Sequence, residues 1–252
     1  MPGNPTPTSP PSSLSQASSS SESVPTQQNP NDPVQESKEQ RRFERWRRSL
    51  MYITGIGLSE SEKEKIMQER EKEFERYECN RCEKWRDSLM KNSPAVVFML
   101  QHLDKIGCRL EKHHFQCMPC DKTRSGGFSP EHGIQLCQNR FFSKAHMEDT
   151  MVHEMIHMFD HCRFKVNWND CYHHACSEVR AASLSGDCRL GRELRRGYFQ
   201  FTKQHQACAR RRAILSVKQN PACSEPGVAE RAVAAVFDSC FNDTRPFDEI
   251  YK

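Results

Sequence analysis

The chain has 252 residues, of which 36% are hydrophobic and 28% are charged, and its formal net charge at pH 7 is +4. This length allows one sizeable domain or two small ones. The longest apolar run, residues 95–100, is far shorter than the ~20 residues that span a bilayer, so we expect no transmembrane helix.

Residues 1–40 are predicted to form a disordered N-terminal arm. The first 37 residues hold eight of the 14 prolines and contain neither Lys nor Arg. Such a composition cannot bury enough apolar surface to compensate for the entropy lost on ordering. The arm also lacks the features of a secretory signal and the Arg-rich character of a mitochondrial presequence. Targeting signals alone would therefore indicate a cytosolic protein.

Residues 41–78 are predicted to form a basic and charged helical segment. It begins with the stretch Arg41–Arg48, in which Phe43 and Trp46 lie among arginines, and continues as a solvated helix over residues 59–77. The basic stretch has three interpretations: a solvated helix start, a contact with anionic lipid, or a nucleic-acid contact. Because no second basic patch or known binding motif supports the last, we expect no nucleic-acid partner.

Residues 79–252 are predicted to form an α+β domain. Residues 85–106 show helical periodicity, interrupted at Pro94 and ended by Gly107. Two or three short strands are expected within residues 113–142. Helical patterns follow over approximately residues 145–160, 170–184, 202–219 and 224–240. A small sheet followed by several helices is typical of the α+β class.

All 13 cysteines lie between Cys79 and Cys240, a high density for a chain kept reduced. One interpretation is disulfide bonding in an oxidising compartment, which would cross-link the C-terminal helical part and leave one thiol unpaired. The other is a structural Cys₄ zinc site formed by residues 79, 82, 117 and 120. It would make the protein a non-catalytic, Cys-rich module that contacts nucleic acid or a protein partner, but nine cysteines would remain unexplained.

The segment His153-Glu154-Met155-Ile156-His157 has the pattern H-E-x-x-H. On a helix, residues four apart share a face, so both imidazoles can bind one Zn²⁺. Glu154 then lies where it can act as a general base towards water. The neighbouring residues are mostly apolar, so the helix should be buried, and buried polar groups need a partner. The sequence therefore predicts one catalytic zinc with His153 and His157 as ligands and Glu154 as the catalytic residue.

A catalytic zinc needs a third protein ligand. Glu178 lies on the following predicted helix, in the arrangement of the gluzincins, and His174 shares its face as an alternative ligand. Asp160 is a further candidate. Candidates for stabilising the oxyanion are residues 172, 173, 174 and 180. The strand candidate over residues 126–136 could pair with an extended substrate, as edge strands do in zincins.

Several longer motifs resemble one family of mitochondrial inner-membrane metalloproteases, which process subunit a of ATP synthase and assemble its membrane sector. The resemblance covers roughly residues 75–250. It is carried by residues 79–85 (CNRCEKW), 93–100 (SPAVVFML), 126–139, 148–160 (EDTMVHEMIHMFD) and 176–188 (CSEVRAASLSGDC).

This resemblance implies a zincin-like fold and a catalytic zinc. It also implies a peripheral protein on the intermembrane-space side of the inner membrane. Two activities are expected: removal of the N-terminal propeptide from the subunit a precursor, and assistance to Fo assembly that does not require proteolysis. Members are imported without a cleaved presequence and trapped by oxidative folding, which would reconcile the targeting signals with the cysteines.

Overall fold

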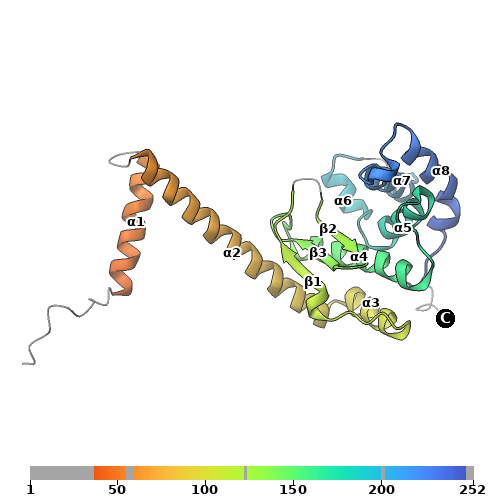
Figure 1. Cartoon of the computed structure of the whole chain (residues 1–252), viewed down its shortest axis with the longest axis horizontal. Helices are drawn as coiled ribbons and strands as arrows, with labels where there is room; N and C mark the ends of the chain where they lie inside the picture. Colours follow the sequence, from red (N-terminus) through yellow and green to blue (C-terminus); the bar gives the residue numbers. More distant parts are fainter. Residues whose placement is uncertain (1–36, 55–58, 122–123, 200–201, 248–252) are drawn as a thin grey trace, which may run out of the picture. The chain divides into compact units, whose positions relative to one another are not determined.

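The structure, a computed structural model, describes residues 37–54, 59–121, 124–199 and 202–247 (Figure 1). The chain divides into two units between Ser59 and Glu60. The described part of the first unit is one helix, α1 (Lys38–Thr54). Residues 1–36, which make up most of the predicted disordered arm, lie outside the described residues.

The second unit is mostly helical and contains one small sheet. Its elements in chain order are α2 (Glu60–Asn92), α3 (Pro94–Lys105), β1 (Phe115–Met118), β2 (Gly126–Ser129), β3 (Gly133–Cys137), α4 (Lys144–Arg163), α5 (Cys171–Leu184), α6 (Leu190–Arg195), α7 (Gln204–Val217) and α8 (Val228–Phe241). This order confirms the predicted α+β class. No described helix has an apolar stretch of the length needed to cross a membrane.

The sheet has the strand order β1-β3-β2, so β2 lies at an edge. β1 pairs with β3 in parallel, with Phe115 opposite Ile134, and β2 pairs with β3 antiparallel, with Phe128 opposite the same residue. Ile134 and Leu136 of β3 are fully buried. Because side chains alternate across a strand, this register directs the apolar residues of β3 into the core that they share with α4.

Capping residues fix where the two central helices begin. At α4, the side chain of Ser143 accepts a hydrogen bond from the amide of His146. At α5, the carboxylate of Asp170 accepts from the amides of Tyr172 and His173. Such caps satisfy amide groups that have no partner within the helix, and they set the rotation at which each helix presents its side chains.

Two apolar cores lie on either side of the α4–α5 pair. The first is formed by α3, the sheet and α4, and includes Met99, Phe115 and Met151. The second is formed by α5, α7 and α8, and includes Val179, Ala213 and Val233. Figure 1 shows α5, α7 and α8 gathered at one side of α4 and α3 at the other. The helices that carry the predicted ligands are therefore each anchored in a core.

Six disulfides join twelve of the cysteines and leave Cys79 free. This confirms the prediction of an oxidised fold with one odd thiol. The pairs are 82–117, 108–162, 120–137, 171–223, 176–240 and 188–208. Cys82 is bonded to Cys117, and Cys120 is bonded to Cys137. Three of the four cysteines proposed for a Cys₄ zinc site therefore have no thiol to bind zinc, so the structure contradicts that site.

The predicted helices agree with the structure except in three places. α2 runs without interruption from Glu60 to Asn92, whereas the sequence predicted one helix over residues 59–77 and a separate helical pattern from residue 85. The short helix α6 was not predicted, because its six residues carry too little periodicity to stand out. The last helix was expected to begin near residue 224, but it begins at Val228, after Gly227 with φ of 79°. Only glycine adopts this backbone conformation readily, so the turn at Gly227 sets the start.

Candidate metal centre

The two histidines of the H-E-x-x-H motif meet Glu178 between α4 and α5. The Nε2 atoms of His153 and His157 lie 3.6 and 3.5 Å from the two carboxylate oxygens of Glu178, and the three ligand atoms all lie within 4.8 Å of one another. Two atoms that bind a tetrahedral ion at ~2.1 Å are about 3.4 Å apart. The spacing and the donor types therefore fit a metal ion such as Zn²⁺.

The electrostatics of the site favour a positive charge between the two helices. Burial lowers the pKa of His157 to about 3, which keeps its imidazole neutral and able to bind a metal. Burial acts in the same direction on His153, but the hydrogen bond to Glu178 and the charge of Glu154 outweigh it and raise the pKa to about 9. Without a metal ion, a proton on His153 therefore compensates the charge of the buried Glu178 carboxylate. A bound metal ion would replace that proton and supply the positive charge in its place.

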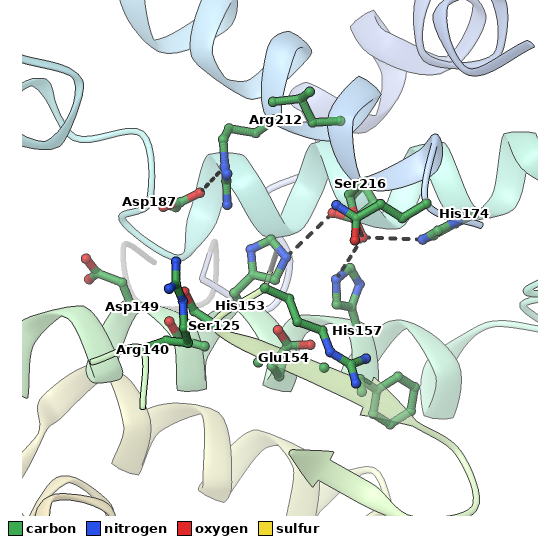
Figure 2. A pocket seen from close by; sticks show the side chains of 18 of the residues that line it. Ser125, Arg140, Asp149, His153, Glu154, His157, His174, Asp187, Arg212 and Ser216 are labelled. Carbon is green, nitrogen blue, oxygen red and sulfur yellow. Dashed lines mark hydrogen bonds and ion pairs between the residues drawn. The ribbon is translucent and has the colours of Figure 1, made fainter. Parts of the chain in front are cut away.

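Glu154 lies on α4 beside the cluster but is not part of it. It is 6% exposed, and burial raises its pKa to about 7 against the opposing charge of His153. A carboxyl group with a pKa near neutrality can both accept and return a proton. Figure 2 shows its side chain next to those of His153 and His157.

A chain of hydrogen bonds orients the imidazole of His157 through its Nδ1 atom. Its Nδ1 lies 2.8 Å from Ser177 Oγ, which donates to Asp160 at 2.8 Å. Arg180 donates to Asp160 at 3.0 Å, and Ser177, Asp160 and Arg180 are each 2% exposed. Since the hydroxyl proton of Ser177 is used towards Asp160, its oxygen must accept from the Nδ1 proton of His157. The lone pair of His157 Nε2 then points towards Glu178 and the cluster.

His174, the alternative ligand, lies 3.3 Å from Glu178 through its Nε2 atom. The side-chain amide of Asn220 donates to His174 Nδ1 at 3.0 Å and to the carbonyl of Trp168 at 2.8 Å. Because Nδ1 accepts this bond, the proton of a neutral His174 resides on Nε2, where it can be donated to Glu178. Ser216 of α7 donates to the same carboxylate at 2.5 Å.

A cavity of about 580 Å³ opens onto the cluster. Its wall includes Gly126, Gly127 and Phe128 of the edge strand β2, and Trp168 lies at the same cavity. A Cβ atom on Gly126 would lie 2.7 Å from Thr150 and 3.1 Å from Glu154. The strand can therefore approach α4 this closely only because residue 126 is glycine.

The structure brings together His153, Glu154, His157 and Glu178, and it places His174 at the edge of the same group. Asp160, the third ligand candidate, is instead bonded to Ser177 and Arg180. Of the four oxyanion candidates, His174 alone lines the cavity. The sequence analysis did not identify Ser177, Ser216 or Asn220, although a buried polar residue in the alanine-rich segment of α5 is a signal that a partner exists.

Two histidines one turn apart, a glutamate from the next helix and a separate carboxylate at a cavity beside an edge strand are the features of a metallopeptidase. Comparison with known proteins agrees. The sequence profile of the peptidase M76 family matches residues 80–248.

Curated proteins named mitochondrial inner membrane protease ATP23 are similar over most of the chain. The protein from Aspergillus clavatus is 47% identical, over 83% of this chain and 89% of its own length. The one from Vanderwaltozyma polyspora is 46% identical, over 88% and 93%, and the one from Yarrowia lipolytica is 47% identical, over 83% and 84%. No solved structure matches the chain significantly.

The chain therefore belongs to the peptidase M76 family. It is a metallopeptidase of the mitochondrial inner membrane.

Proposed function

We propose that the protein is a zinc endopeptidase with a zincin-like, gluzincin-type active site. His153 and His157 of α4 and Glu178 of α5 are the zinc ligands. The observation that carries this proposal is the approach of both Nε2 atoms to the Glu178 carboxylate, at 3.6 and 3.5 Å. The neutral state of His157 and the lone-pair direction imposed by Ser177 support it.

Glu154 is the catalytic residue in this proposal. A bound zinc ion would supply Lewis acidity, which polarises the peptide carbonyl and makes water more acidic. The carboxylate of Glu154 takes one proton from the attacking water as the water oxygen bonds to the carbonyl carbon. As the carbon–nitrogen bond of the peptide breaks, Glu154 gives that proton to the nitrogen of the leaving amine and is regenerated unprotonated. Its raised pKa supports both transfers.

His174 is assigned to positioning rather than to metal binding. The donation from Asn220 supports a proton on His174 Nε2, and a protonated nitrogen cannot bind a metal ion. Donation from His174 and from Ser216 to Glu178 would then fix the rotation of the carboxylate.

The edge strand β2 is proposed to bind the substrate. Its outer edge has no strand partner in the described sheet, and three of its residues line the cavity next to Glu154. An extended peptide that pairs with β2 would pass the catalytic carboxylate in a regular conformation, and the depth of the cavity would accommodate its side chains.

The substrate proposed from the family resemblance is the subunit a precursor of ATP synthase, from which the enzyme removes the N-terminal propeptide. We also propose a second role in Fo assembly that is independent of proteolysis, and a peripheral position on the intermembrane-space side. Six disulfides support an oxidising compartment. The proposed organisation is an N-terminal arm over residues 1–40, a charged helical segment over 41–78 and the peptidase domain over 79–252.

The direct test is to incubate the purified oxidised protein with subunit a precursor, with and without a chelator, and to add zinc back. We expect cleavage that the chelator abolishes and zinc restores. Cleavage that persists in chelator would contradict the zinc mechanism. A protein that binds one zinc per chain but leaves the precursor intact would contradict the substrate assignment and not the metal site.

A further inference from the structure

Helix α1 carries an exposed apolar stripe, which no other described residue of its unit buries. Phe43, Trp46, Leu50 and Ile53 are spaced by three or four residues, so they share one face of the helix. They are 45–75% exposed, and none of the residues of α1 is buried. The rings of Phe43 and Trp46 lie 5.8 Å apart on this face.

The rest of α1 is strongly basic. The helix contains six basic residues and two acidic ones. Arg42 lies four residues before Trp46, and Arg47 lies between Phe43 and Leu50, so both border the stripe. Arg41, Arg45 and Arg48 lie on the opposite side of the helix. An apolar stripe bordered by arginines is the pattern of a helix that lies in a membrane interface.

We propose that α1 is an interfacial helix that binds the enzyme to an anionic phospholipid surface. Phe43, Trp46, Leu50 and Ile53 enter the boundary between headgroups and acyl chains. Arg42 and Arg47 extend along their apolar stems to reach phosphate groups.

Two observations favour lipid over a protein groove. Trp46 is a residue type enriched at membrane interfaces, where an apolar ring and a polar N–H are both accommodated. The positive charge of α1 complements a negatively charged surface, and the family to which the chain belongs acts at the inner membrane. This inference rests on that location and does not depend on the zinc site or on the substrate.

The test uses the full-length oxidised protein with two kinds of vesicle: phosphatidylcholine alone, and phosphatidylcholine mixed with phosphatidylglycerol. Sedimentation should show binding to the anionic vesicles that weakens as salt is added. Replacing both Phe43 and Leu50 by Ser should weaken binding about tenfold or more. Replacing an arginine of α1 by Gln should weaken it about fivefold.

A matched control comes from α2, where Phe74 and Tyr77 are 60% and 59% exposed. The Phe74→Ser and Tyr77→Ser double variant removes a similar exposed apolar area and should bind like the wild type. Lipids brominated on their acyl chains should quench the fluorescence of wild-type protein, and the Trp46→Phe variant should lose this quenching. That readout separates insertion of the stripe from attraction by charge alone.

Four results would overturn the proposal. The first is equal binding to both kinds of vesicle, and the second is an unchanged affinity of the Phe43→Ser and Leu50→Ser double variant. The third is tight binding to duplex DNA without binding to anionic vesicles, which would make α1 a nucleic-acid contact. The fourth is a dimer that these two substitutions dissociate, with no binding to vesicles, which would assign the stripe to a second copy of the chain.

Discussion

Replacing Ser177 by Ala tests how the protein fixes the direction of His157, a proposed metal ligand. The serine hydroxyl bridges His157 and Asp160 through two bonds of 2.8 Å. Without it, the imidazole of His157 is free to rotate about its χ2 angle, and Asp160 keeps only its bonds to Arg180.

The expected magnitude follows from these contacts. Loss of a group that orients a metal-binding histidine typically weakens metal affinity about 10–100-fold, or about 1.4–2.7 kcal/mol. The free energy of unfolding of the metal-free protein should also fall, by about 1–3 kcal/mol, because Asp160 is 2% exposed and loses a donor. At saturating zinc the variant should still bind one ion, because both Nε2 atoms and Glu178 remain.

The assay is competition for zinc between the protein and a chromophoric chelator. Ser183→Ala is the matched control: it removes a hydroxyl from the same helix, at a half-buried position. The control should keep the affinity of the wild type. An unchanged zinc affinity in the Ser177 variant would refute the orienting role, and an equal loss in both variants would mean that any damage to α5 has the same effect.

The remaining predictions concern the proposed site and the disulfides. Glu154→Gln should abolish precursor cleavage while zinc content stays at one per chain; loss of zinc would show that Glu154 is a ligand. Glu178→Ala should lower zinc affinity by orders of magnitude, whereas His174→Ala should lower it far less; the reverse order would exchange their roles. Gly126→Ala should reduce cleavage strongly and zinc binding little, because the added methyl group displaces Thr150 and Glu154. Cleavage at the wild-type rate would refute the close approach of β2 to α4. Alkylation of the unfolded, unreduced protein should modify one cysteine per chain, and ten or more modified cysteines would exclude the oxidised fold. Reduction should lower the thermal midpoint strongly, since each disulfide contributes ~2–4 kcal/mol to the free energy of unfolding.

Part of the site can be predicted from the sequence because it depends only on local geometry. The spacing of His153 and His157 places them on one face of any helix, and the apolar residues around them indicate burial. The choice among Glu178, His174 and Asp160 is not local. It depends on how α4 and α5 cross and on which side chains α7 brings to them, and no spacing along the chain encodes that crossing.

The disulfide network shows the same limit. The count of cysteines predicts that most are paired, but a set of this size allows very many connectivities. Cys176 and Cys240 are 64 residues apart in the sequence, and α5 and α8 must pack together before they can pair. The longer helices were predictable from periodicity and from residues that interrupt or end a helix, such as Pro94 and Gly107, because those signals lie within each segment.

The C-terminal helices give a physical reason for a peptidase domain that extends well past its proposed metal ligands. α5 carries Glu178, and it is joined to the C-terminal part by the disulfides 171–223 and 176–240. Ser216 of α7 bonds the Glu178 carboxylate, and Arg180 donates to the carbonyls of Asp243 and Arg245. The rotation of α5 is therefore set by segments that follow it in the chain, and so is the direction of its carboxylate. α4 is fixed separately, through its packing on the sheet. Since a metal site requires both helices to be positioned within a fraction of an ångström, the C-terminal part acts on the metal centre without contributing a ligand to it.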